Sequence, residues 1–417
     1  MSLMNHLLGR ASKSFHWLCL ISLLSMIFTG PVVAQVENLS KIPNLDLDIN
    51  QAKDYTPIVM PDDYPEELTS FFDNSTESRS FVVVDVETNR ILAQRGANIP
   101  YPIASMTKIL TAYLVYKAID EGKLTLKTEV EAPADLTKVL SENYELSATP
   151  LVAGEKYTVN ELLHALIMMS GNDAASLLMR EIYGSESAAT QAMIDQLTTW
   201  GFIDFSLYTT SGVPNEYLPE DWRMSGSAAS NENVMSAQDL ALMAQYIIKE
   251  YPEILDISSK DQYEFKKDSP YAQIFYTTNS LLPGKSLERD GITGLKSGST
   301  QKAGDCFVAT GKENGREIIA VSMGIFTRED GTISSPYNDL NLILDALKEN
   351  PDLYKNDKLP TNLLPSLEER QAIEASKEAE AAAANEDGQD ESKETTLENK
   401  RDNPITNFIG KLFDFLR

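Results

Sequence analysis

The sequence predicts an α+β domain, in which an antiparallel sheet from both ends of the domain surrounds a helical middle. Two observations support this prediction. Strand-like runs occur before residue 95 and again after Asp290, and helical patterns dominate the segment between them. An antiparallel sheet with segregated helices is one of the few stable layer architectures. The length of 417 residues allows one large domain or two smaller ones.

The sheet is expected to take strands from both sides of the helical middle. Residues 80–86 form an apolar run typical of a buried strand, and residues 91–94 return after a turn at Asn89-Arg90. Asn314-Gly315 marks a hairpin near the C-terminal side. The C-terminal strands are predicted at 292–298, 306–310 and 317–321.

Helix signals fill the middle of the chain and follow the last strand. Thr158-Val159-Asn160-Glu161 is a capping box, and Ser236-Ala237-Gln238-Asp239 starts a helix that ends before Pro252. Residues 35–79 and 132–154 are polar, and we expect them to be irregular. The remaining helices are predicted from Ser105 to Asp120, from 170–173 to Gly184, and from Tyr337 to Leu347.

The N-terminus has the pattern of a secretory signal peptide. Arg10 and Lys13 precede a mostly apolar run over residues 15–28, and Val32-Val33-Ala34 has small residues at the cleavage-determining positions. An uncleaved anchor helix is the alternative. Thr29, Gly30 and Pro31 weaken that alternative because they interrupt the apolar run.

Removal of residues 1–34 would leave Cys306 as the only cysteine and His164 as the only histidine. An intrachain disulfide and a multi-histidine zinc site are then excluded, and we expect no metal and no cofactor. His164 lies in a helical run and is interpreted as a packing or surface residue. The formal net charge of −26 argues against a nucleic-acid partner, because binding to phosphates needs a basic face.

A hydroxyl and an amine three residues apart, Ser105 and Lys108, occur at the start of the first predicted helix. Residues i and i+3 share one helix face, so the two side chains should meet at the helix N-terminus. The helix dipole and burial both disfavour the ammonium form of Lys108. A neutral lysine amine can take the proton of a serine and make it a nucleophile. A second S-x-x-K, Ser299 to Lys302, shows that this spacing also arises by chance.

Two more motifs contain groups suited to catalysis or binding. Ser170-Gly171-Asn172 lies between two predicted helices, where side chains can project into a cleft; a plain helix cap is the alternative. Ser141-Glu142-Asn143 repeats the pattern in a loop setting. Lys296-Ser297-Gly298 starts a predicted strand, where glycine permits close approach of a ligand. An ordinary strand with a lysine at its turn is the alternative there.

In this order, S-x-x-K, S-x-N and K-[ST]-G resemble the signature of the penicillin-binding and serine β-lactamase superfamily. The flanking residues are similar to those of D-alanyl-D-alanine carboxypeptidases, over roughly residues 70–350. The resemblance implies a fold of the β-lactamase and penicillin-binding transpeptidase type. The similar segments are Pro102–Lys108, Met169–Ala174, Gly294–Thr300 and Ala303-Gly304.

The resemblance implies catalytic roles for residues of all three motifs. Ser105 would attack the carbonyl between two terminal D-alanines, and Lys108 would accept its proton. Ser170 would pass a proton to the departing D-alanine amine, assisted electrostatically by Lys296. Water would then hydrolyse the acyl-enzyme formed on Ser105.

The resemblance also implies a set of substrate-binding residues. Asn172 would bind a substrate amide, and Ser297 would bind the terminal carboxylate beside Gly298. The backbone amide of Ser299 would form the oxyanion hole with that of Ser105. Ser297 and Ser299 replace the threonine and histidine that are frequent in these enzymes, but position 297 keeps its hydroxyl and position 299 acts through its backbone. Arg328 is a candidate for assisting carboxylate binding.

The sequence therefore predicts an exported serine-type D-Ala-D-Ala carboxypeptidase at the outer face of the cytoplasmic membrane. It would remove the terminal D-alanine from peptidoglycan stem pentapeptides and be inhibited by β-lactam antibiotics through acylation. A serine β-lactamase, with the same motifs and rapid deacylation, is the first alternative. A catalytically silent cell-wall-binding protein is the second.

The C-terminal region is expected to lie outside the catalytic domain. Residues 366–404 contain twelve acidic residues, five basic ones and no aromatics, a composition that cannot bury a core. Residues 405–417 carry an apolar helical stripe that is too short to span a bilayer. We expect an in-plane membrane anchor; a helix docked on the domain is the alternative. The predicted division is a signal peptide (1–34), an irregular lead-in (35–69), the carboxypeptidase domain (70–350), an acidic, partly disordered linker (351–404) and the anchor helix (405–417).

Overall fold

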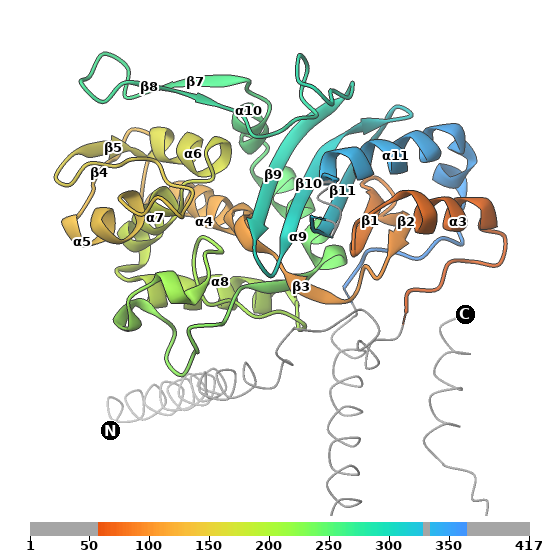
Figure 1. The fold of residues 1–417 in the computed structure, drawn as a ribbon, viewed down its shortest axis with the longest axis horizontal. Coiled ribbons are helices and arrows are strands. Elements are labelled where there is room, and N and C mark those ends of the chain that lie inside the picture. Colours follow the sequence, from red (N-terminus) through yellow and green to blue (C-terminus); the bar gives the residue numbers. More distant parts are fainter. Residues whose placement is uncertain (1–56, 328–333, 365–417) are drawn as a thin grey trace, which may run out of the picture. The chain divides into compact units, whose positions relative to one another are not determined.

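The computed structural model describes residues 57–327 and 334–364. Its centre is a five-stranded antiparallel sheet in the order β2-β1-β11-β10-β9. The strands are β1 (Ser80–Asp85), β2 (Arg90–Arg95), β9 (Ile292–Thr300), β10 (Gly304–Glu313) and β11 (Arg316–Ile325). Figure 1 shows β1 of the N-terminal side beside β11 of the C-terminal side, with β2 at the edge of the sheet. The predicted α+β fold, with a sheet from both ends of the domain, is confirmed.

The sheet forms because its strands bury apolar residues and its turns have suitable residues. Asn314 and Gly315, between β10 and β11, have φ values of 51° and 77°. Positive φ at both central residues is the requirement of a type I′ turn, as the sequence predicted. β1 pairs with β11 so that Val83 lies opposite Ala320. Both residues belong to the main hydrophobic core, together with Leu344 of the last helix.

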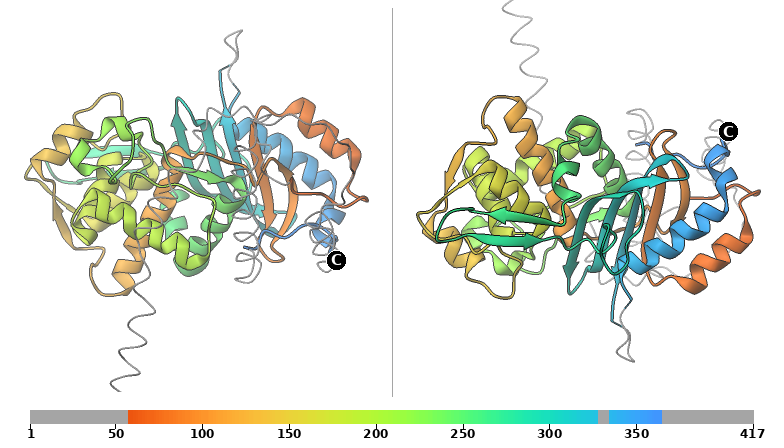
Figure 2. Two further views of the ribbon diagram at one scale, coloured as in Figure 1. Left: turned by 90° about the horizontal axis from the view of Figure 1, so that it is seen from below. Right: turned by 90° about the horizontal axis from the view of Figure 1, so that it is seen from above.

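Some helices pack on the two faces of the sheet, and the others gather beside its edge strand β9. Figures 1 and 2 show α3 (Glu66–Ser75) and α11 (Pro336–Glu349) on one side of the sheet and α9 (Ala237–Glu250) on the other. Among the described residues, no helix has both the length and the apolar character needed to cross a membrane. The other helices are α4 (Lys108–Asp120), α5 (Ala134–Leu136), α6 (Val159–Met168), α7 (Asn172–Tyr183), α8 (Glu186–Trp200) and α10 (Ile254–Ser258).

Three two-stranded ribbons complete the described part of the chain. They are β3 (Pro100–Pro102) with β6 (Val234–Ser236), β4 (Glu129–Glu131) with β5 (Lys156–Thr158), and β7 (Gln262–Phe265) with β8 (Gln273–Tyr276).

Helix starts follow the capping signals in the sequence. The Thr158 side chain accepts a hydrogen bond from the backbone of Glu161, which closes the predicted capping box. α7 ends at Gly184, whose φ of 87° only glycine adopts readily.

The start of the domain differs from the prediction. Residues 66–75, expected to be irregular, form α3, so the folded part begins before the predicted boundary at residue 70. Leu68 and Phe72 are spaced i, i+4 and are buried in the core, which is why this short polar segment is helical. The abundance of Asp, Asn and Pro around it obscured that pair in the sequence.

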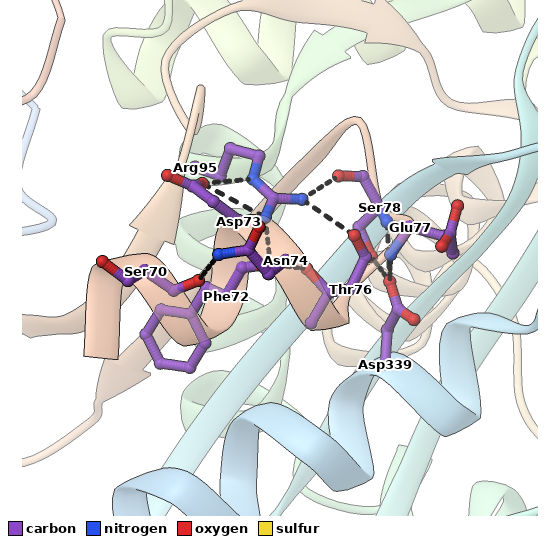
Figure 3. Close-up of polar contacts among 9 residues, drawn as sticks. All are labelled: Ser70, Phe72, Asp73, Asn74, Thr76, Glu77, Ser78, Arg95 and Asp339. Atoms are coloured by element: carbon purple, nitrogen blue, oxygen red, sulfur yellow. Dashed lines mark hydrogen bonds and ion pairs between the residues drawn. The ribbon is translucent and has the colours of Figure 1, made fainter. Parts of the chain in front are cut away.

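Polar contacts tie the C-terminal end of α3 to β2 and α11 (Figure 3). The Arg95 guanidinium donates to the carbonyls of Phe72 and Ser78, the latter at 2.9 Å, and forms an ion pair with Asp73 at 3.3 Å. A cation is favourable there because the C-terminal end of a helix carries a partial negative charge. The buried carboxylate of Asp339 in α11 accepts from the backbone N–H of Ser78 at 2.6 Å.

Three further segments differ from the prediction. The expected loop at 132–154 contains α5 and a π-helical turn over Thr137–Ser141. Residues 186–200, for which no helix was predicted, form α8 with Ser185 as its side-chain cap. Residues 351–363, assigned to the linker, pack on the domain, since Leu359 is fully buried. The predicted signal peptide, the rest of the linker and the anchor at 405–417 lie outside the described residues.

Candidate active site

Ser105 lies in a 3₁₀ turn, Ala104–Thr107, directly before Lys108 opens α4. With three residues per turn, a 3₁₀ helix places side chains i and i+3 in line, so Ser105 and Lys108 point the same way. Ala104 has a positive φ of 48°. Such strain in a residue other than glycine persists where the surroundings hold it in place, often at functional sites.

The amine of Lys108 is enclosed by three oxygen atoms. Its Nζ lies 2.9 Å from Ser105 Oγ, 2.8 Å from Asn172 Oδ1 and 2.8 Å from the Ser211 carbonyl oxygen. The side chain is 0% exposed. Burial, followed by the nearby charge of Lys296, lowers the pKa of Lys108 well below the usual value of a lysine. The amine is therefore neutral over a wider pH range than an exposed lysine.

A neutral amine has two N–H donors and one lone pair. The amide oxygen of Asn172 and the carbonyl oxygen of Ser211 can only accept hydrogen bonds, so they take the two N–H groups. The lone pair is left for the Ser105 hydroxyl, the only one of the three partners that can donate. The arrangement orients a base toward the hydroxyl proton of Ser105.

Ser170 and Asn172 lie at the junction of α6 and α7. Ser170 has a φ of 58°, and a Cβ at Gly171 would lie 2.3 Å from Thr149 Oγ1, so only glycine fits at 171. The buried Asp173 carboxylate accepts from the Thr149 backbone N–H at 2.8 Å. The junction is thus fixed against the preceding loop, and it presents Asn172 to Lys108.

The third motif lies on β9, the edge strand that faces the helical part in Figure 1. Lys296 is buried, and this burial lowers its pKa to about 7. Ser297 is half-buried and Ser299 is exposed, both on the same strand. β9 packs against the turn that holds Ser105. The structure therefore gathers the three predicted motifs around the start of α4: Asn172 of α7 bonds to Lys108, and β9 packs on α4 and on the turn before it.

A sequence model of the D-alanyl-D-alanine carboxypeptidases, peptidase family S11, matches residues 68–327, more than half of the 417 residues. The chain belongs to this family. The match begins two residues before the domain boundary expected at residue 70 and includes all three motifs.

Curated D-alanyl-D-alanine carboxypeptidases are similar to about three fifths of this chain. D-alanyl-D-alanine carboxypeptidase DacF of Bacillus subtilis is 27% identical over 254 residues, which are 61% of this chain and 59% of the relative. DacA of Escherichia coli is 27% identical over 249 residues, 60% and 56% of the two chains. The matched region thus spans less than two thirds of the length of these relatives.

Solved structures of penicillin-binding proteins share the fold. A peptidoglycan synthesis regulatory factor (PBP3) from Streptococcus pneumoniae is 34% identical, with a TM-score of 0.62 over 66% of this chain and 72% of that chain. Penicillin-Binding Protein D2 from Listeria monocytogenes, in an ampicillin-bound form, is 24% identical, with a TM-score of 0.52 over 65% and 97% of the two chains. The expected fold of the β-lactamase and penicillin-binding type is confirmed.

Residues that support the candidate site were not identified from the sequence. The buried carboxylate of Glu186, at the start of α8, accepts from the backbone N–H of Thr210 at 2.8 Å and from Ser176 Oγ at 2.6 Å. It thereby holds the loop whose Ser211 carbonyl meets Lys108. In the sequence, nothing about Glu186 distinguishes it from the other acidic residues of the chain. A carbonyl acceptor such as that of Ser211 has no residue-type signal at all.

The competing motifs have other contacts. Ser141 Oγ donates to Asp173 at 2.8 Å, so this S-x-N serine supports the junction. Lys302, of the second S-x-x-K, donates to the Ser230 carbonyl at 2.6 Å. His164 stacks on Tyr263 with ring centroids 3.7 Å apart, consistent with the predicted packing role. Arg328 lies outside the described residues.

Proposed function

We propose that this protein is an exported serine D-Ala-D-Ala carboxypeptidase that removes the terminal D-alanine from peptidoglycan stem peptides. The observation that carries the proposal is the buried Lys108 amine. Its two N–H groups meet obligate acceptors, and its lone pair faces the Ser105 hydroxyl. Membership in the D-alanyl-D-alanine carboxypeptidase family supports this choice of substrate class.

Acylation begins when Lys108 takes the Ser105 proton and Ser105 Oγ attacks the carbonyl between the last two D-alanines. Negative charge then develops on the substrate oxygen. The backbone N–H groups of Ser105 and Ser299 stabilise that charge, a contribution made mainly in the transition state. Lys108 becomes an ammonium ion as the charge develops, and Asn172 and Ser211 still accept its hydrogen bonds.

Collapse of the tetrahedral intermediate breaks the peptide bond and needs a proton for the departing amine. Ser170, fixed at the α6–α7 junction, relays a proton from the Lys108 ammonium to the D-alanine amine, so that Lys108 becomes neutral again. Lys296, with a pKa of about 7, is partly protonated near neutral pH and lends positive charge to this step. Water then hydrolyses the ester on Ser105 and restores the enzyme. A β-lactam ring enters the same path and acylates Ser105.

The proposed location rests on the sequence. The N-terminal signal pattern indicates export, and the apolar stripe at 405–417 indicates attachment to the outer face of the cytoplasmic membrane. A stem peptide is accessible there, because peptidoglycan lies outside the membrane.

D-alanine release and penicillin labelling together test the proposal. Wild-type enzyme should release D-alanine from an acylated L-Lys-D-Ala-D-Ala peptide, and mass spectrometry after labelled penicillin should find the adduct on Ser105. Ser105→Ala should abolish both, with an unchanged melting temperature. Rapid turnover of a chromogenic cephalosporin without D-alanine release would indicate a β-lactamase instead. Neither activity in the wild type would indicate a silent wall-binding protein.

A further inference from the structure

A second hydroxyl lies beside the serine expected to bind the terminal carboxylate. Thr278, in the segment after β8, has its Oγ1 3.1 Å from Ser297 Oγ on β9. Thr278 is exposed and Ser297 is half-buried, so a ligand can reach both. Thr278 precedes Ser297 by 19 residues and belongs to none of the three motifs.

Thr278 is held in place from a third element. The Tyr337 hydroxyl of α11 donates to the Thr278 carbonyl at 2.8 Å. The Tyr337 ring packs on Phe307 with centroids 4.7 Å apart, and Phe307 pairs directly with Ser297 across β10 and β9. Burial raises the pKa of Tyr337 to about 12, so its hydroxyl remains a donor at neutral pH. Tyr337 therefore holds Thr278 through its hydroxyl, and its ring packs on the residue that lies opposite Ser297 in the sheet.

We propose that Thr278 and Ser297 together bind the terminal carboxylate of the substrate, an inference that rests on the proposed function. Each hydroxyl has one proton, which rotates to suit its acceptor, and a carboxylate offers two acceptor oxygens. Without a ligand, one hydroxyl donates to the other. With a carboxylate, both protons turn to the ligand, because hydrogen bonds to a charged acceptor are the stronger ones. Thr278 thereby contributes to selectivity for peptides with a free carboxyl terminus.

Steady-state kinetics of Thr278→Val on two substrates test this proposal. The substrates are an acyl-D-Ala-D-Ala peptide and the same peptide with a terminal carboxamide. Loss of one hydrogen bond to a charged group should lower kcat/KM for the carboxylate peptide by about 10- to 100-fold. The rate on the carboxamide should stay at its wild-type level. Thr278→Ser, which keeps the hydroxyl, should recover most of the activity.

Thr199→Val is the matched control, because Thr199 is an exposed threonine on α8 whose hydroxyl bonds within its own helix. It should leave both substrates unaffected. Equal losses on the two peptides for Thr278→Val, or no loss on either, would overturn the carboxylate role while leaving the proposed function intact. A wild-type enzyme that neither releases D-alanine nor is labelled by penicillin would overturn the proposed function, and this inference with it.

Discussion

Gly298 on β9 packs against the backbone nitrogen of Ser105. A Cβ built at Gly298 would lie 3.0 Å from that nitrogen, 3.0 Å from the Ile103 carbonyl oxygen and 3.1 Å from the Met106 nitrogen. These contacts are tighter than ordinary van der Waals distances, and all of the atoms belong to the backbone. Glycine at 298 therefore allows β9 to approach the turn that presents the nucleophile.

Gly298→Ala should impair acylation more than folding. The methyl group pushes β9 away from the Ser105 N–H, one of the two proposed oxyanion donors. Loss of one such donor typically lowers kcat by about 10²- to 10³-fold, which sets the upper range of the expected effect. Stopped-flow measurement of penicillin acylation, alongside thermal melting, checks it. Wild-type acylation in the variant would show that the Ser105 N–H does not depend on this approach.

Lys108→Arg should fail although it keeps a positive charge. Arginine stays protonated in proteins, so it has no lone pair to accept the Ser105 proton. General-base catalysis usually contributes about 10²- to 10⁴-fold, and we expect a loss of that order in the acylation rate. Lys302→Arg is the matched control, because Lys302 belongs to the second S-x-x-K and its exposed amine donates to the Ser230 carbonyl. Acylation of Lys108→Arg at the rate of the control would exclude Lys108 as the base.

Much of the site could be predicted because its reacting groups lie in short motifs. The spacing of Ser105 and Lys108 within one turn determines their contact, whatever the rest of the fold. The components of the site that support Lys108 lie far away in the chain. The Ser211 carbonyl has no signature in residue type, and Glu186 acts only because α8 packs against the 209–212 loop.

The fold was predictable where periodicity was strong. Apolar runs and the Asn314-Gly315 turn indicated the sheet, and side-chain caps indicated α6 and α9. Residues 351–363 were missed because Leu353 and Leu359 are isolated apolar residues in a polar stretch. Their burial depends on the completed sheet, which no local pattern reveals.

Glu186→Gln should change the pH dependence of acylation on its acid side only. The rate rises with pH as Lys108 loses its proton. The Glu186 carboxylate favours the ammonium form and thus raises the pKa of Lys108, against the larger effects of burial and of Lys296. Neutral glutamine removes that effect, so the pKa of Lys108 falls and the acid limb moves to lower pH. Glutamine also keeps an oxygen to accept from Thr210.

The alkaline side of the same profile provides an internal control. We assign it to Lys296, which loses its proton as pH rises through about 7, and Glu186 is not among the causes of that shift. This limb should therefore stay in place. Glu129→Gln, at an exposed site on β4, should leave both limbs unchanged. An acid limb that does not move in Glu186→Gln would mean that another group controls it.

Truncation after Pro404 should release a soluble, active enzyme from membranes. In residues 405–417 the apolar side chains follow the spacing i, i+3, i+4, i+7, i+8, i+11, a continuous helical stripe. Pro404 is suited to the start of such a helix, and the acidic stretch before it would act as a tether. The stripe consists of Ile405, Phe408, Ile409, Leu412, Phe413 and Leu416.

Fractionation in low and high salt, with D-alanine release from each fraction, checks this prediction. The segment has little net positive charge, so its binding should rest on apolar burial, and the full-length protein should stay with the membrane in high salt. Phe408→Asp with Leu412→Asp should mimic the truncation, since both place charges on the stripe. Membrane binding that survives truncation would place the anchor elsewhere, with an uncleaved N-terminal segment as the main alternative. Loss of activity on truncation would instead mean that these residues dock on the catalytic domain.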